Sequence, residues 1–200
     1  MEVTREIFWN VGQGARYLTY AFMVLALAIF AYGFYKRYKM WMIGKPSSFS
    51  FRTRLSERIC YFIKNGIFHR TILREPYPGM MHFFLFWGFL ILAIGTAIVA
   101  FQDDVLRPLL GINILKEGFY LIFSFVLDLA GILAIIGTLI AIYRRYVQKP
   151  ERLDSKSDDL LSLLWILVVL VSGFLVEALR IASTKPEFEV YSFVGWNLAK

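Results

Sequence analysis

Long runs of apolar residues, separated by shorter polar segments, dominate the pattern along the chain. One run follows Arg74 and Glu75 and reads "PYPGMMHFFLFWGFLILAIGTAIVAF", without a single charged residue. At a rise of about 1.5 Å per residue, such a run crosses the roughly 30 Å hydrocarbon core of a bilayer as one helix. Three other runs have a similar length. The pattern therefore predicts an all-α membrane bundle with four spans, over residues 15–35, 78–101, 119–143 and 160–182.

The segment between the first two runs has an amphipathic pattern. Leu55, Ile59 and Phe62 recur at helical spacing, with basic residues on the other faces. This spacing predicts a helix lying in the membrane interface, within residues 51–73. On a continuous helix, His69 would share the apolar face of Phe62 and point toward the bilayer or a neighbouring span. We group all residues, 1–200, into one membrane domain.

The composition agrees with this class and indicates an orientation. The chain is 58% hydrophobic and 18% charged, with a net charge of +7. Residues 36–77 carry ten Lys and Arg, and residues 144–159 carry five. Because basic loops stay in the cytoplasm, we expect a multi-pass protein of the cell membrane with its N-terminus outside. Membrane lipid with anionic headgroups accounts for the positive charge, so no nucleic acid is expected as a partner.

A histidine lies about one turn inside the second span, where a polar ring is costly to bury and therefore indicates a structural or functional role. The residues that share the direction of His82 at 100° per residue are aromatic nearby and small further in: Phe86, Phe89, Ala93, Thr96 and Ala100. Two interpretations remain open. His82 is an axial ligand of an iron porphyrin packed against this stripe, or it is a structural residue that bonds a carbonyl or headgroup.

The string Pro-x-Pro-Gly-x-x-His-x-x-x-x-x-Gly-Phe, from Pro76 to Phe89, resembles a known family. It is similar to the second span of the cytochrome b-type domain that precedes an iron–sulfur region in heterodisulfide-reductase-related membrane oxidoreductases. That domain is itself similar to the gamma subunit of respiratory nitrate reductase. The resemblance implies haem b held by His82, menaquinone or another quinone as substrate, and a cytoplasmic iron–sulfur or flavoprotein redox partner.

The chain departs from this family in its ligands. In the family, a later span brings further histidines, and a cysteine-rich region follows. This chain has two histidines and one cysteine, so any iron–sulfur cluster, which needs about four ligands, belongs to a partner or a missing domain. We therefore expect a piece of a longer protein, or half of a split unit, that ends before a further span. If the chain is complete, His69 is the remaining candidate for a second histidine ligand. Leu92 stands where the gamma-subunit pattern would place a second haem ligand, so two haems held in that way are not expected.

Two acidic residues inside the spans are candidate proton acceptors in quinol oxidation. Asp128 and Glu177 both fall in the predicted outer half of their spans, where they could face one another. Carboxylates at such a place suit proton transfer. The structural alternatives are an ion pair of Glu177 with Arg180 and a hydrogen bond of Asp128 with Ser124, each about one helical turn away.

The sequence thus predicts a membrane electron-transfer domain that links quinone to an iron–sulfur partner through haem b. A haem-free membrane anchor or scaffold is the competing interpretation, and a small transporter is the third, weakened because no internal repeat is visible. Four glycines inside the spans are expected to allow close helix packing, namely Gly88, Gly95, Gly131 and Gly137.

Overall fold

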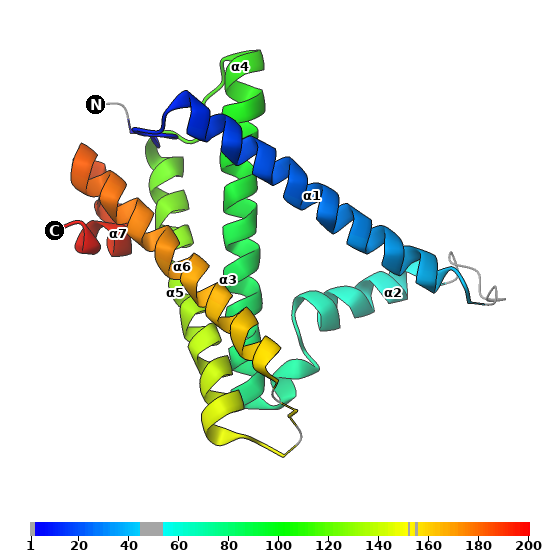
Figure 1. Cartoon of the computed structure of the whole chain (residues 1–200). Helices are drawn as coiled ribbons and strands as arrows, with labels where there is room; N and C mark the ends of the chain where they lie inside the picture. Colours follow the sequence, from blue (N-terminus) through cyan, green and yellow to red (C-terminus); the bar gives the residue numbers. More distant parts are fainter. Residues whose placement is uncertain (1–2, 45–53, 152, 155) are drawn as a thin grey trace. The chain divides into compact units, whose positions relative to one another are not determined.

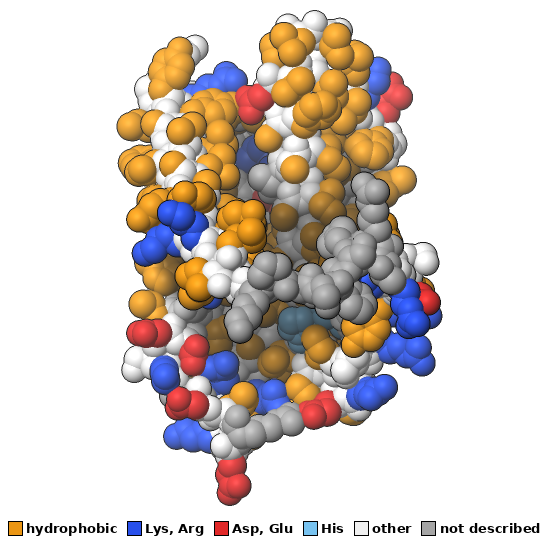
Figure 2. All heavy atoms as spheres, turned by 90° about the vertical axis from the view of Figure 1, so that its right-hand side faces the viewer, with side chains coloured by type: hydrophobic (Ala, Val, Ile, Leu, Met, Phe, Trp, Pro, Cys, Tyr) orange, Lys and Arg blue, Asp and Glu red, His pale blue; other side chains and the backbone are white. Residues whose placement is uncertain are grey.

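The computed structural model describes residues 3–44, 54–151, 153–154 and 156–200. Among these residues, four helices are long and apolar enough to cross a membrane. The predicted all-α fold with four spans is confirmed. In the space-filling view, apolar side chains cover most of the visible surface of the long helices, and charged side chains gather mainly near the lower end (Figure 2). The four spanning segments are Gln13–Trp41, Pro76–Leu110, Glu117–Gln148 and Ser157–Thr184.

The chain divides into two compact units. The first contains residues 3–5 together with the chain from Phe62 onward, and the second contains residues 6–61. The second unit consists mainly of the long helix α1 (Gln13–Trp41) and most of the short helix α2 (Leu55–Phe62). The first unit holds the other three spans and both histidines, so the candidate chemistry lies within it.

The amphipathic segment is shorter and less regular than predicted. Its first residues, 51–53, lie outside the described residues. Helix α2 ends at Phe62, a π-helical turn follows over Ile63–Ile67, and His69 adopts a left-handed φ of 52°. The continuous helix that would have placed His69 on the apolar face of Phe62 is therefore not formed. The sequence Lys-Asn-Gly at 64–66 explains the break, since Asn and Gly are poor helix formers.

Helices α3 (Pro76–Phe101) and α5 (Glu117–Tyr143) lie side by side along most of their length (Figure 1). Glycine makes this approach possible. A Cβ on Gly88 would lie 2.8 Å from the carbonyl oxygen of Ala130, and one on Gly137 would lie 2.7 Å from the backbone nitrogen of Leu85. The predicted packing role of these glycines is confirmed, because any side chain would force the two backbones apart.

The two ends of α3 are set by specific residues. Pro76 begins the helix, and a Cβ on Gly79 would lie 2.7 Å from the carbonyl oxygen of Ile72, so the entry loop folds tightly against the first turn. The helical path does not stop at residue 101 as predicted. It continues through a π-helical turn, Gln102–Leu106, into α4 (Arg107–Leu110), and ends at Gly111 with φ 64°.

Helix α6 (Ser157–Thr184) packs on α5. A Cβ on Gly131 would lie 2.6 Å from the Phe174 ring, so this contact also depends on a glycine. After α6 the chain reverses at Lys185, which has a φ of 45°, and forms a 3-10 turn over Glu187–Tyr191. The short helix α7 (Phe193–Leu198) then packs back against α6 and α5. The sequence patterns did not predict this return.

Candidate functional site

The carboxyl groups of Asp128, on α5, and Glu177, on α6, lie in hydrogen-bonding contact within the bundle. Helix α7 covers them. The backbone N–H of Val194 donates to Asp128 Oδ2 at 2.7 Å, and Asp128 is 2% exposed. A Cβ on Gly195 would lie 2.7 Å from Cγ of Glu177, so only glycine leaves room for that side chain. The return of the chain therefore packs the start of α7 against both carboxyl groups.

A third acidic side chain, missed by the sequence analysis, organises the same end of the bundle. Glu189 lies in the turn between α6 and α7, and its side chain is completely buried. Its carboxylate accepts from Arg180 Nη1 at 2.6 Å, from the Tyr120 hydroxyl at 2.7 Å and from Ser192 Oγ at 2.8 Å. A largely buried arginine near the end of a span needs an acidic partner, and the acids of the following segment were a signal that the sequence analysis did not use.

These contacts overturn the two structural alternatives. The ion pair of Arg180 is with Glu189 and not with Glu177. Asp128 accepts from the α7 backbone, while the Ser124 hydroxyl interacts with Tyr120. The reason lies in the return of the chain after α6: its 3-10 turn offers Glu189 to Arg180, and the start of α7 offers the Val194 N–H to Asp128.

Glu189 is held in its ionised form. Burial alone would raise the pKa of its carboxyl group, but the hydrogen bond and charge of Arg180, with the hydroxyls of Tyr120 and Ser192, lower that pKa below its usual value. Arg180 and Glu189 therefore form a neutralised pair. The carboxyl pair of Asp128 and Glu177 lies outside this ion pair, and its two members contact each other.

The two histidines meet near the start of α3, away from the carboxyl pair. The ring of His69 lies against the ring of His82, with centroids 4.8 Å apart at 75°, and against Phe86, with centroids 4.4 Å apart. His69 is 3% exposed, and its Nδ1 atom has no hydrogen-bond partner within the described residues. Although the helix breaks before it, His69 reaches the neighbouring span.

The direct contact limits how the histidines could hold a haem. Each axial nitrogen lies about 2 Å from its metal, so two rings on opposite sides of one iron have centroids roughly 6 Å apart with the porphyrin between them. Rings in edge contact at 4.8 Å leave no such space. His69 and His82 do not fit as the two axial ligands of one haem. Among the described residues, no group of three or more His, Cys, Asp and Glu side chains is placed to hold a metal ion.

The two sites are well separated along the bundle. Gly95 on α3 packs against Leu127, the residue before Asp128. Since Gly95 is thirteen residues beyond His82, the carboxyl pair lies about 20 Å further along the helix axis. One site is therefore near the first turn of α3 and the other toward its far end.

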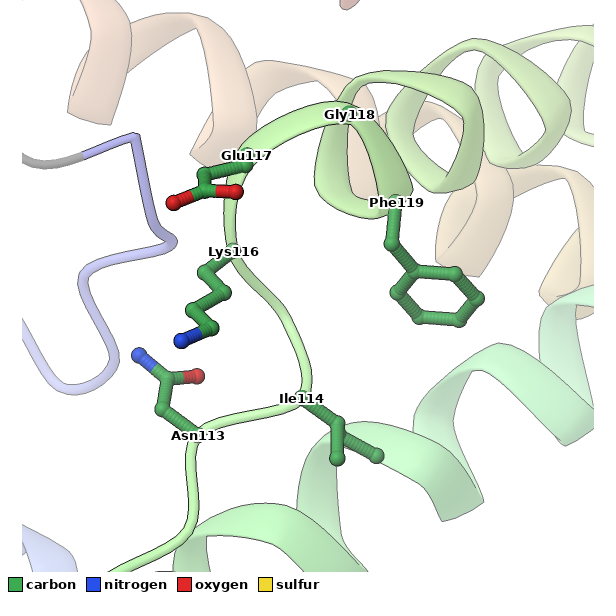
Figure 3. Close-up of a pocket in the computed structure, with 6 residues that line it drawn as sticks. All are labelled: Asn113, Ile114, Lys116, Glu117, Gly118 and Phe119. Atoms are coloured by element: carbon green, nitrogen blue, oxygen red, sulfur yellow. The ribbon is translucent and has the colours of Figure 1, made fainter.

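An open hollow of about 630 Å³ lies where the chain enters α5. Asn113, Lys116 and Glu117 extend to one side of this connection, and Ile114 and Phe119 to the other (Figure 3). The connection is fixed by buried Gln102, whose Oε1 accepts from the backbone N–H groups of Ile114 and Leu115. The hollow lies at the same end of α5 as Tyr120 and Glu189.

Comparison with known proteins gives two relatives, both named as oxidoreductases. The chain is 36% identical over 168 residues, 84% of its length, to the EtfAB:quinone oxidoreductase of Syntrophomonas wolfei. It is 26% identical over 131 residues, 66% of its length, to the probable iron-sulfur-binding oxidoreductase FadF of Bacillus subtilis. The matches span 23% and 18% of those proteins, so the chain corresponds to about a quarter of their length or less. No family model and no solved structure matches.

These names support the oxidoreductase part of the predicted resemblance, with its quinone and iron–sulfur links. Assignment to a cytochrome b or to the nitrate reductase gamma type, and with it haem b, stays a prediction.

Proposed function

We propose that this chain is the membrane part of a quinone-linked oxidoreductase, which passes electrons between a membrane quinone and an iron–sulfur or flavoprotein partner. The names of the two relatives support the quinone and the iron–sulfur partner. The more similar match includes most of the membrane-spanning bundle, because it covers 84% of this chain.

The contact between Asp128 and Glu177 carries the proposal. When a quinol becomes a quinone, two O–H bonds break, two electrons leave for the redox partner and two protons must be accepted. An ionisable pair inside an apolar span is costly and typically serves such proton transfer. In the reverse direction the same carboxyl groups would donate protons as a quinone gains electrons.

Asp128 also has a structural task that must be separated from this role. Its Oδ2 accepts the backbone N–H of Val194 and thereby holds the start of α7. Asp128→Asn keeps an acceptor oxygen at this position but removes the exchangeable carboxyl proton, whereas Asp128→Ala removes both. The comparison of the two variants distinguishes anchoring from proton transfer.

The test measures quinol-dependent electron transfer in the protein purified with its native partner. Asp128→Asn and Glu177→Gln should each slow this rate by about 10²–10⁴-fold, the usual worth of general acid–base catalysis, while the protein stays folded. Glu187→Gln, at an exposed position in the nearby turn, is the control and should leave the rate unchanged. Wild-type rates in both carboxyl variants would contradict the proton-transfer role.

We further propose that His82 is an axial ligand of haem b and that His69 positions it. Support comes from the half-buried His82 ring, its aromatic neighbour Phe86, and the buried Nδ1 of His69 without a partner. Any second ligand to such a haem would come from a residue other than His69, given the ring contact described above. A bound haem b would supply one-electron transfer. In this arrangement His82 provides a nitrogen and His69 fixes the orientation of its ring.

Absorbance spectroscopy of the variants tests this assignment. His82→Ala should lose the b-type bands of the reduced-minus-oxidised spectrum while the protein still inserts. His69→Phe should retain haem with a changed reduction potential, since His69 is a positioning residue. Unchanged bands in His82→Ala would favour the haem-free anchor, and complete haem loss in His69→Phe would contradict the positioning role.

A further inference from the structure

A second hollow, of about 450 Å³, lies in the segment that leads into α3. It is open to its surroundings rather than enclosed. Three basic and two apolar side chains line it, and we call it the basic hollow: Lys64, Phe68, Arg70, Leu73 and Arg74.

The backbone around the basic hollow is fixed by local hydrogen bonds. The N–H of Arg70 donates to the carbonyl oxygen of Lys64 at 3.1 Å, which closes the turn. The Thr71 hydroxyl donates to Asn65 Oδ1 at 2.7 Å across the same turn. The basic side chains therefore start from a defined loop, so their convergence is built into the fold.

No carboxylate among the described residues neutralises the positive charge of the basic hollow. Within the described part of the chain, Lys64, Arg70 and Arg74 form no ion pair with a carboxylate. Glu75 follows Arg74 in sequence but does not line the hollow. Three cations around one hollow create a positive potential that favours an anionic occupant.

The position of the basic hollow indicates which anion this is. Arg74 lies two residues before Pro76, where the second spanning segment begins, so the hollow lies at the depth of the lipid headgroups. The apolar lining side chains are exposed, Phe68 by 57% and Leu73 by 40%. At this depth, basic and apolar groups side by side match a lipid phosphate with attached acyl chains, since the headgroup would meet the cations and a chain would lie along Phe68 and Leu73.

We propose that the basic hollow binds an anionic phospholipid, with its phosphate among Lys64, Arg70 and Arg74 and an acyl chain along Phe68 and Leu73. The bound lipid would also brace the loop that carries His69, because the Leu73 N–H donates to the His69 carbonyl oxygen at 2.9 Å. This site is independent of the quinone chemistry proposed above.

Trp87 provides a reporter for this lipid. Its ring lies 6.4 Å from the ring of Phe68, between centroids. A chain whose other four tryptophans are replaced by Phe is reconstituted into phosphatidylcholine nanodiscs that contain brominated phosphatidylglycerol or, at equal mole fraction, brominated phosphatidylcholine. Brominated phosphatidylglycerol should quench Trp87 fluorescence more strongly than brominated phosphatidylcholine does. Unlabelled phosphatidylglycerol should remove this extra quenching, whereas inorganic phosphate should not.

Two charge-matched variants decide whether the site is local. Lys64→Gln/Arg70→Gln/Arg74→Gln should lower the preference for phosphatidylglycerol by about tenfold or more, since each basic residue near a headgroup contributes several-fold. Lys36→Gln/Arg37→Gln/Lys39→Gln, which removes the same charge from the end of α1, should leave it unchanged. Arg70→Gln alone is the milder variant if the triple change impairs folding, and it should lower the preference in part.

Three results would overturn the proposal. Equal quenching by the two brominated lipids would mean that the hollow does not prefer an anionic lipid, and would favour an acidic protein partner instead. An equal loss of the phosphatidylglycerol preference in the α1 variant would mean that the overall positive charge, and not the basic hollow, attracts the lipid. Displacement of the lipid by inorganic phosphate would make the site a general anion site.

Discussion

Removal of the Glu189 side chain tests how the return of α7 is held. The carboxylate is completely buried and accepts three hydrogen bonds, one of them from Arg180 at 2.6 Å. Glu189→Ala leaves the Arg180 charge without its partner and removes the acceptor of the Tyr120 and Ser192 hydroxyls. Breaking a buried ion pair on one side costs about 3–5 kcal/mol.

For a domain of this size, each kcal/mol corresponds to about 2–4 °C in Tm, so the expected decrease is about 6–20 °C. Circular dichroism of the purified protein in detergent measures the unfolding transition. Glu187→Ala is the matched control, because Glu187 belongs to the same turn but is exposed. Its Tm should stay within about 2 °C of wild type, as is usual for surface substitutions worth about 0.5 kcal/mol.

A Glu189→Ala variant that melts with the Glu187→Ala control would refute the reasoning. It would mean that the attraction between Arg180 and Glu189 stabilises the fold by no more than the free-energy cost of removing the two charges from water. Arg180→Met in the Glu189→Ala background separates these terms. If the unpaired arginine causes the damage, the double variant should recover much of the lost stability.

Three further predictions concern acid sensitivity, helix packing and orientation. Because the folded-state pKa of Glu189 is lowered, its contribution to stability is present above the ordinary pKa of about 4.3 and is lost as the pH falls through the folded-state value. The Tm difference between wild type and Glu189→Gln should therefore narrow only below about pH 4, and a constant difference down to pH 2 would argue against an ionised Glu189. Gly88→Ala should lower the Tm, because the new Cβ meets the Ala130 carbonyl oxygen at 2.8 Å, whereas Gly173→Ala, with no atom within 4 Å, should keep or slightly raise it. In a Cys60→Ser background, an impermeant thiol reagent added outside cells should label Asp104→Cys and spare Lys149→Cys, and the reverse pattern would invert the predicted orientation.

The membrane fold was predictable because a lipid environment constrains sequence strongly. Spans of more than twenty apolar residues leave little choice of structure, and glycines such as Gly88 and Gly137 mark where two of them approach. The contact of Asp128 with Glu177 followed from their similar depth in antiparallel spans. What periodicity could not supply was the return of the chain after Thr184, since a helix of six residues has too few apolar positions to show a period.

The partners of the polar side chains were harder to predict, because they lie in the connecting segments. Arg180 has an acid three residues before it, and only the turn after α6 shows that Glu189 is nearer. The spacing left His69 facing either the bilayer or a neighbouring span, and its contact with His82 depends on a π-helical turn and a left-handed residue that the spacing does not show. Local spacing describes contacts within one helix, whereas these contacts depend on how the connecting segments fold.

The account rests on quinone-linked electron transfer, and stopped-flow mixing of the purified protein and its native partner with a water-soluble menaquinol tests it most directly. Electrons are counted from the absorbance of the reduced partner, and protons from a pH-indicating dye in weak buffer. The account predicts two electrons and two protons per quinol, with both signals slowed together in Asp128→Asn. Quinol that is oxidised no faster than in the absence of the protein would contradict it.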